Sequence, residues 1–313
     1  ETVRRVGGSF GRQGVTHSGM GSIGVFDSGV GGLSTLHAIR QAYPDEHLIY
    51  VADSGHAPYG DQAASAVIAR AQAITHFLLD APCKAIVVAC NTASVVALPT
   101  LRAMTSVPII GMEPAIKPAT LATRTGVVGV LATTRTVQSE SVQRLIAQFG
   151  GSVRVMLQAA PGLVERVEQG YLADEHTRDL LTHYLTPLLA AGIDQLVLGC
   201  THYYFLRPLI TSIVGGGVTV VEPAEAIARQ LGARSNLIAG GRVLEASAAA
   251  ALQTPHAVTG GFAFYSSAND LPQAERILSQ LWGDGLAGCS SCRCKRDAFR
   301  TTGATWPRSG RRR

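Results

Sequence analysis

The 313-residue sequence lacks any uncharged apolar run of the ~18 residues needed to span a bilayer. It also lacks the charged start, apolar centre and small-residue cleavage site of a secretory signal peptide. These absences argue against membrane and secreted proteins, so we expect a cytoplasmic one. The six cysteines stand at scattered positions (83, 90, 200, 289, 292 and 294), so a disulfide framework is not expected either.

The net charge of +5 comes from the two ends of the chain. Residues 286–313 carry eight Lys or Arg and one Asp, and residues 1–20 carry three Arg and one Glu, so the body between them is net acidic. We expect both ends to be disordered, solvated extensions that do not contact nucleic acid or membrane. The tail cysteines Cys289, Cys292 and Cys294 lack the second pair or nearby His of a structural zinc site, so no metal is expected.

Two apolar runs end in a cysteine that is followed by hydrogen-bonding side chains. The run Ala85 to Ala89 leads into Cys90, Asn91 and Thr92, and the run Gln195 to Gly199 leads into Cys200, Thr201 and His202. Uninterrupted apolar runs of this length are typical of buried parallel strands. Open α/β sheets bind their ligands at the carboxyl ends of such strands.

The two halves of the chain repeat three short patterns in the same order. Ile23 to Ser28 resembles Val128 to Thr133, Val87 to Thr92 resembles Val197 to His202, and Ile110 to Ala115 resembles Val220 to Ala224. The cysteines are 110 positions apart and the Glu-Pro pairs are 109 apart. We therefore predict an α/β fold of two similar parallel-sheet α/β domains, related by pseudo-twofold duplication, with the active site in the cleft between them. The predicted domains are 21–115, completed by 223–285, and 116–222.

Other segments alternate between strand and helix patterns. Strands are predicted at 22–26, 47–52, 107–112, 125–132 and 218–221, and helices at 33–43, 63–79, 138–148, 163–169 and 174–191. We expect the helix after Cys90 to be broken at Pro99. The turn from Asp27 to Leu33 is rich in glycine, but Ser34 stands where a dinucleotide-binding fingerprint needs its third glycine. The loop from Asp53 to Asp61 is a candidate substrate loop.

Two cysteines facing each other across a cleft suit proton transfer at a carbon. One thiolate removes a proton from one face, and the opposite thiol delivers a proton to the other, which inverts the stereocentre. Nucleophilic catalysis needs one thiolate with a base, and redox chemistry needs two adjacent thiols. A free thiol has a pKa of ~8.5. The α-hydrogen of an amino acid is a weaker acid, with a pKa about ten or more units higher, so the site must offset an unfavourable free energy on the order of 14 kcal/mol. Preorganised donors and exclusion of water must supply much of it.

Pyridoxal phosphate offers another route to the same inversion, because it serves as an electron sink. That route needs a lysine that forms a Schiff base. The body of the chain has only Lys84 and Lys117, and neither follows an evident phosphate-binding loop. We therefore expect no cofactor.

Four segments together resemble the bacterial glutamate racemases of the aspartate/glutamate racemase family: Asp27 to Leu33, Pro58 to Gly60, Cys90 to Ala93 and Gly199 to Tyr203. The resemblance covers roughly residues 21 to 285. It implies two related α/β domains and a cofactor-independent isomerase that interconverts L- and D-glutamate and supplies D-glutamate for peptidoglycan synthesis. The family is often dimeric, so a homodimer is an expectation.

The resemblance also assigns roles to particular residues. It implies that Cys90 and Cys200 are the two catalytic acid/bases. The implied substrate contacts are Asp27, Ser28, Tyr59, Gly60, Asn91, Thr92, Thr201 and His202, and the implied supporting residues are Asp53, Thr136 and Glu168. Three positions depart from the family pattern: Ser54, Ala132 and Tyr204 replace a common threonine, glycine and proline.

Two alternatives remain at this point. One is an aspartate racemase, or a related racemase of the same superfamily; the Pro58 to Gly60 loop and the Asp27 to Leu33 turn favour glutamate. The other is a non-catalytic protein whose basic tail binds nucleic acid or a protein partner. The intact motif cysteines argue against it.

Overall fold

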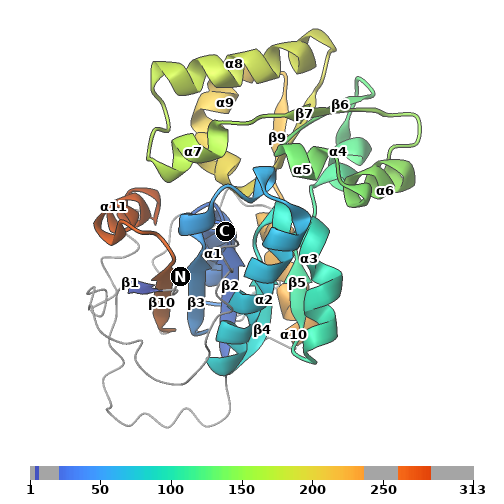
Figure 1. Ribbon diagram of the computed structural model, residues 1–313. Helices are drawn as coiled ribbons and strands as arrows, with labels where there is room; N and C mark the ends of the chain where they lie inside the picture. Colours follow the sequence, from blue (N-terminus) through green and yellow to red (C-terminus); the bar gives the residue numbers. More distant parts are fainter. Residues whose placement is uncertain (1–3, 7–20, 236–259, 283–313) are drawn as a thin grey trace, which may run out of the picture.

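The computed structural model describes residues 4–6, 21–235 and 260–282, which form two β-sheets covered by helices (Figure 1). The first sheet has the strand order β1 (Arg4–Val6), β10 (Phe262–Ser266), β3 (Leu48–Ala52), β2 (Ser22–Asp27), β4 (Cys83–Val88) and β5 (Ile109–Gly111). The second has the order β7 (Arg154–Ala159), β6 (Val127–Ala132), β8 (Gln195–Gly199) and β9 (Thr219–Val221). Neighbouring strands are parallel, except that β1 pairs antiparallel with β10.

The two sheets share one topology. The order β3-β2-β4-β5 in the first sheet corresponds to β7-β6-β8-β9 in the second. The three repeated sequence patterns lie on the pairs β2/β6, β4/β8 and β5/β9, and the fourth pair is β3/β7. The predicted fold, two similar parallel-sheet α/β domains, is therefore confirmed.

Alternate residues of the first sheet pack against helices on its two faces. Val25 and Val87 belong to a core cluster that includes side chains of α1 (Leu33–Ala42) and α10 (Ala224–Ser235). Their neighbours Phe26 and Val88 pack with α2 (Ala64–Asp80) and α3 (Asn91–Met104) instead. Because successive strand side chains point to opposite faces, a strand buried on both faces must be apolar throughout. This explains the uninterrupted run before Cys90.

The second sheet is covered in the same way. One face packs on α7 (Leu163–Glu168), α8 (Glu175–Ala190) and α9 (Arg207–Val214), and the other on α4 (Ile116–Ala122) and α6 (Glu140–Phe149). The cluster behind α7, α8 and α9 is continuous with the α1 side of the first sheet, so the two domains share one core. The remaining helices are α5 (Thr134–Val137), α11 (Leu271–Trp282) and the short 3-10 turns η1 (Ser54–His56), η2 (Tyr59–Asp61) and η3 (Thr201–Leu206).

The strands of the second sheet lie between Val127 and Val221, and those of the first sheet come from three separate parts of the chain. Residues 236–259, 283–285 and the extension 286–313 with its three cysteines lie outside the described residues. The prediction of disorder for 1–20 is wrong for Arg4–Val6, which forms β1 on the edge of β10. The edge of β10 offers unpaired backbone N–H and C=O groups, and this short segment pairs with them.

Two further strands were not predicted from the sequence, and one helix end was misplaced. β7 is an edge strand whose residues are exposed or only partly buried, so its apolar signal is weak. β10 completes the first sheet from the far end of the chain. The helix after Cys90 is not broken at Pro99: α3 continues through it, with Pro99 exposed and Ala97, Leu98 and Leu101 buried. Burial of that face outweighs the lost hydrogen bond.

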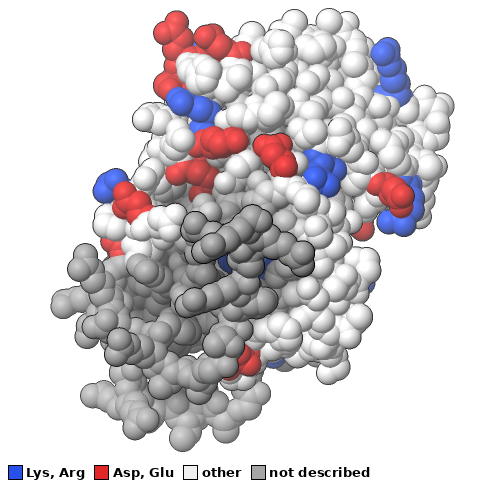
Figure 2. Space-filling view, in the orientation of Figure 1, with Lys and Arg blue, Asp and Glu red and all other residues white. Residues whose placement is uncertain are grey.

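The surface agrees with an acidic body. In Figure 2 acidic side chains gather over the region where α7 and α8 lie in Figure 1, and Asp174, Glu175 and Asp179 at the start of α8 are exposed. Among the described residues, no helix has both the length and the apolar character to cross a membrane.

Candidate active site

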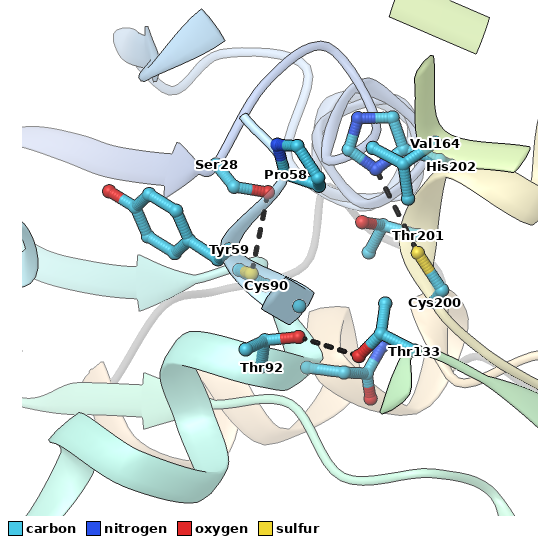
Figure 3. A pocket seen from close by; sticks show the side chains of 12 residues that line it. Ser28, Pro58, Tyr59, Cys90, Thr92, Thr133, Val164, Cys200, Thr201 and His202 are labelled. Atoms are coloured by element: carbon cyan, nitrogen blue, oxygen red, sulfur yellow. Dashed lines mark hydrogen bonds between the residues drawn. The ribbon is translucent and has the colours of Figure 1, made fainter. Parts of the chain in front are cut away.

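One pocket between the two domains collects the carboxyl ends of their strands. It encloses about 250 Å³ of empty space, part of it open to solvent. Cys90 and Cys200 stand on opposite walls (Figure 3). The lining residues are Ser28, Pro58, Tyr59, Gly60, Cys90, Asn91, Thr92, Thr133, Val164, Cys200, Thr201 and His202. Two thiols from duplicated strands therefore border the same space.

Cys90 lies at the junction of β4 and α3, where it caps the helix. The Ala93 N–H donates to the Cys90 sulfur at 3.4 Å, and the thiol donates to the Ser28 hydroxyl at 3.7 Å. Burial, followed by the charge of Asp27, raises the pKa of Cys90 well above its ordinary value of 9.0. The Ala93 N–H acts in the opposite direction, because a helix N-terminus favours a thiolate.

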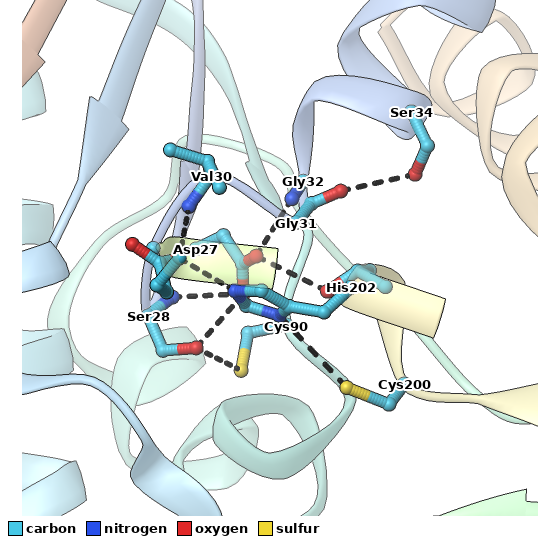
Figure 4. A network of polar contacts seen from close by, with 12 residues as sticks. Asp27, Ser28, Val30, Gly31, Gly32, Ser34, Cys90, Cys200 and His202 are labelled. Carbon is cyan, nitrogen blue, oxygen red and sulfur yellow. Dashed lines mark hydrogen bonds and ion pairs between the residues drawn. The ribbon is translucent and has the colours of Figure 1, made fainter. Parts of the chain in front are cut away.

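Asp27 is fully buried at the end of β2 and ties the two domains together (Figure 4). One carboxylate oxygen accepts the Ser28 N–H at 2.8 Å, and the other accepts the Gly32 N–H at 2.6 Å. That second oxygen also accepts the Thr201 hydroxyl of the second domain at 3.1 Å. Burial raises the pKa of Asp27 above its ordinary 3.8. Asp27 does not line the pocket, so it acts on the residues that do.

On the opposite wall, Cys200 is followed by a buried histidine with a carboxylate partner. The His202 Nδ1 lies 3.9 Å from the Cys200 sulfur, and its Nε2 lies 2.6 Å from the Glu168 carboxylate. Glu168 also accepts the Val30 N–H of the first domain at 2.7 Å. Burial alone would lower the pKa of His202, but the contacts with Cys200 and Glu168 raise it well above 6.5. The arrangement therefore favours the protonated form of the imidazole beside the second thiol.

The glycines of the Asp27 to Leu33 turn allow this close approach. A Cβ at Gly31 would meet the His202 ring, and a Cβ at Gly29 would meet the Glu168 carboxylate. Only glycine lets the turn pack this tightly against the second domain.

Threonine hydroxyls form a cluster across the lower part of the pocket in Figure 3. Thr92 at the start of α3 lies 3.0 Å from the Thr133 hydroxyl, which donates to Thr136 at 2.9 Å. Thr92 belongs to the first domain and the other two to the second. The cluster therefore brings hydroxyl groups from both walls together at the pocket.

Most of the residues predicted from the sequence line the pocket. Asp27, Asp53, Thr136 and Glu168 do not; they hold lining residues through hydrogen bonds. The pocket is also lined by Pro58, Thr133 and Val164, which were not predicted as site residues. The repeat could have found Thr133, because it aligns with Ser28. Val164 carries no sequence signal, since it resembles any apolar residue of an amphipathic helix.

A second cavity, of about 260 Å³, lies on the other side of Asn91, Cys200 and Thr201. Tyr204 and Glu222 also line it. The Glu222 carboxylate lies 3.3 Å from the Arg207 guanidinium. Burial raises the pKa of Glu222 to about 7, although Arg207 lowers it in part.

The residues that the structure describes contain no group of three His, Cys, Asp or Glu side chains suited to a metal ion. Lys84 forms an ion pair with Glu46, and Lys117 lies over the Phe149 ring. Neither lysine lines the pocket.

Known proteins resemble this chain over most of its length. A family model described as Asp/Glu/hydantoin racemase matches residues 23–231. The glutamate racemase of Ectopseudomonas mendocina is 47% identical over 263 residues, covering 84% of this chain and 95% of that protein. That of Herpetosiphon aurantiacus is 52% identical over 208 residues, covering 66% of this chain and 82% of that protein.

Solved structures give the same result. The Escherichia coli glutamate racemase, crystallised with L-glutamate and the activator UDP-MurNAc-ala, matches with a TM-score of 0.70 and 33% identity, covering 84% of this chain and 94% of that one. A Bacillus anthracis glutamate racemase matches with a TM-score of 0.71 and 29% identity, covering 83% and 93%. The chain therefore belongs to the Asp/Glu/hydantoin racemase family and, within it, to the glutamate racemases, which makes it an amino-acid racemase and hence an isomerase.

Proposed function

We propose that this racemase interconverts L-glutamate and D-glutamate without a cofactor, by proton transfer between Cys90 and Cys200 at the α-carbon. One thiolate takes the α-proton, and the electron pair left on carbon delocalises into the adjacent carboxylate. The opposite thiol then gives its proton to the other face. One proton is taken and one is returned, so the step is balanced and needs no oxidant or reductant.

The observation that carries this proposal is the placement of Cys90 and Cys200 on opposite walls of one pocket. Inversion at carbon requires a proton donor and an acceptor on opposite faces. Among the described residues no lysine lines the pocket, so the chain offers no amine there for a Schiff base.

The other lining groups suit an amino acid with two carboxylates. The Thr92 hydroxyl can donate to a carboxylate oxygen. Those of Ser28, Thr133 and Thr201 can do so only by turning away from Asp27 and Thr136, to which they donate in this structure. The start of α3 adds backbone N–H groups and the positive end of a helix dipole. Asn91 has a buried side-chain oxygen without a hydrogen-bond partner, which can accept from the substrate ammonium group. Donors fixed before the reaction stabilise the charge that develops on the α-carboxylate.

Further roles follow the family resemblance, except that of Asp27. We propose Ser28, Tyr59, Gly60, Asn91, Thr92, Thr201 and His202 as substrate contacts, and Asp53, Thr136 and Glu168 as residues that position them. The resemblance implies a substrate contact for Asp27, but Asp27 lies behind the lining, so we propose that it too positions these residues. We also propose that the D-glutamate formed serves peptidoglycan synthesis. The domain boundaries, the cytoplasmic location and a homodimer stay predictions.

Polarimetry on purified protein with L-glutamate and no added cofactor tests the proposal. The rotation should fall to zero as the racemate forms. Cys90→Ala and Cys200→Ala should each abolish this change. Cys83→Ala is the matched control: Cys83 is a buried thiol outside the pocket, with its pKa raised to about 12 by burial, and its loss should leave racemisation intact.

Near-normal activity in either pocket variant would rule out the two-thiol mechanism. A panel with L-aspartate in place of L-glutamate separates the two substrates. Faster racemisation of aspartate would overturn the assignment of glutamate while leaving the mechanism in place.

A further inference from the structure

A buried ion pair stands behind the Cys90 side of the pocket. Asp53 follows β3 and is fully buried. Arg70 of α2, whose side chain is 13% exposed, approaches the Asp53 carboxylate with two parallel N–H groups. Its Nε donates to one carboxylate oxygen at 2.9 Å, and its Nη2 donates to the other at 2.6 Å. This two-pronged geometry is the strong form of an Arg–carboxylate contact.

The same carboxylate holds the substrate loop. The Tyr59 hydroxyl donates to the Asp53 carboxylate at 2.6 Å, and the His56 Nδ1 lies 3.1 Å from its other oxygen. Tyr59 is 1% exposed and lines the pocket, as does Gly60 beside it. Arg70 does not line the pocket. It therefore acts on the pocket from behind, through Asp53 and through the Tyr59 hydroxyl that shares this carboxylate.

We propose that Arg70 is a positioning residue for the racemisation: through the Asp53 carboxylate, it holds Tyr59 and Gly60 in the wall of the pocket on the Cys90 side. This inference rests on the proposed function. It assigns a role in the reaction to a helix residue outside the substrate loop and outside the sequence motifs.

The charge balance explains why an arginine is needed. Burial alone would raise the pKa of Asp53, but the hydrogen bonds from His56, Arg70 and Tyr59 and the Arg70 charge hold it well below its ordinary 3.8. An isolated buried carboxylate would take up a proton instead. Asp53 also contacts β2, because its N–H donates to the Asp27 carbonyl at 3.0 Å. An ionised Asp53 is a charged acceptor for the Tyr59 hydroxyl throughout the working pH range.

Replacing Arg70 by methionine keeps an apolar stem of similar length and removes the guanidinium. We expect Arg70→Met to lower kcat/KM about ten- to a hundredfold at neutral pH, the range expected for the loss of hydrogen bonds to a charged group. Asp53 then takes up a proton more readily, so activity should fall as the pH is lowered toward about 6, and the wild type should show no such fall. Arg70→Lys keeps the charge but loses the two-pronged contact. Its kcat/KM should therefore lie between those of the wild type and Arg70→Met.

A double variant separates positioning from a general loss of structure. Asp53→Asn removes the titrating group, so Arg70→Met/Asp53→Asn should lose the acidic fall in activity. It should also be no less active than Arg70→Met alone, because the two side chains act as one unit. Added guanidinium ion should partly restore an Arg70→Ala variant.

Arg40→Met is the matched control. Arg40 is a partly buried arginine of the first domain that donates to the carbonyls of Pro44 and Glu46, before β3, and of Gly261, before β10. Its loss should reduce stability without creating an acidic fall in activity. If Arg70→Met keeps the wild-type kcat/KM and pH profile while the wild type racemises glutamate, the inference is wrong and the proposed function stands. If the double variant loses activity additively, Arg70 does not act through Asp53.

Discussion

At the scale of single residues, the site is built from pairs that correspond between the domains. Cys90 caps α3 and Cys200 precedes η3, and each stands directly after a buried strand. Their neighbours differ, since Cys90 contacts Ser28 whereas Cys200 lies beside His202, whose other ring nitrogen contacts Glu168. The two thiols therefore sit in unequal electrostatic surroundings, although they occupy equivalent places in the fold.

Glu222 makes stability depend on pH. Its side chain is 16% exposed and its pKa is raised to about 7 from 4.5. Because the folded state favours the protonated form, the stabilisation is complete below the unfolded pKa and is lost as pH rises through about 7. Relative to Glu222→Gln, the wild-type free energy of unfolding should fall by about 2–4 kcal/mol between about pH 4.5 and about pH 8.

Urea denaturation of both proteins at the two pH values measures this difference. Glu225→Gln serves as the control for removing a neighbouring acidic charge at an exposed position, where the side chain is 68% exposed. If the free energy of unfolding changes with pH by the same amount in the wild type and in Glu222→Gln, Glu222 titrates alike in the folded and unfolded states.

Single residues also show how far the sequence could predict the site. The repeated cysteines and the turn residues beside them were recognisable because each follows a long apolar run. The sequence could not show that Asp27 and Glu168 lie behind the lining residues. An acidic residue looks the same in the sequence whether it contacts substrate or supports a neighbouring side chain. Val164 enters the pocket through helix packing that has no local sequence pattern.

At the scale of elements, α3 shows that tertiary packing can outweigh the helix-breaking tendency of a proline. Pro99 lies inside the helix and is exposed, while the opposite face is buried against the first sheet. Pro99→Ala should therefore restore a backbone donor without removing buried contacts. We expect a gain of about 1–3 kcal/mol in the free energy of unfolding.

Chemical denaturation measures that gain. Pro187→Ala provides a second case, because Pro187 is also exposed inside a helix, α8. If both substitutions destabilise the protein, the prolines contribute packing or chain stiffness that outweighs the missing hydrogen bond.

Strands with strong apolar runs were predictable, whereas β7 and β10 were not. β7 has a mixed sequence because an edge strand is buried less, and β10 lies far along the chain from the strand it pairs with. Register and pairing across such distances depend on the assembled core rather than on local composition.

At the scale of the whole molecule, the pocket exists only because the two domains are packed together. Gly60 contributes to this packing: a Cβ at this position would lie 2.7 Å from the Thr133 Cβ of the second domain. Gly60→Ala should force the two walls apart and lower kcat/KM on the order of a hundredfold, since catalysis is sensitive to displacements of about 1 Å. Each domain should still fold.

Steady-state kinetics with small-angle X-ray scattering tests this effect. Gly60→Ala should show a larger radius of gyration than the wild type. Gly216→Ala is the matched control, because a Cβ there meets no neighbouring atom. Normal activity in Gly60→Ala would mean that the interface near Thr133 can relax without cost.

The duplication is the feature of the whole molecule that the sequence predicted best. Three repeated patterns at nearly constant offsets indicated two similar domains, and the matching strand orders confirm it. The continuous core between the domains was not predictable, because it joins side chains of α1 with those of α7, α8 and α9.

Isotope incorporation in D2O tests the two-thiol mechanism most directly. With L-glutamate as substrate, the D-glutamate formed early in the reaction should carry deuterium at the α-carbon, because the delivering thiol exchanges with solvent. The unreacted L-glutamate should keep its α-protium, because the thiol that removes this proton is not the thiol that delivers deuterium. Proton NMR of the separated enantiomers measures both. Early D-glutamate that retains the substrate's α-protium would show that one base serves both faces, and would contradict proton transfer between Cys90 and Cys200.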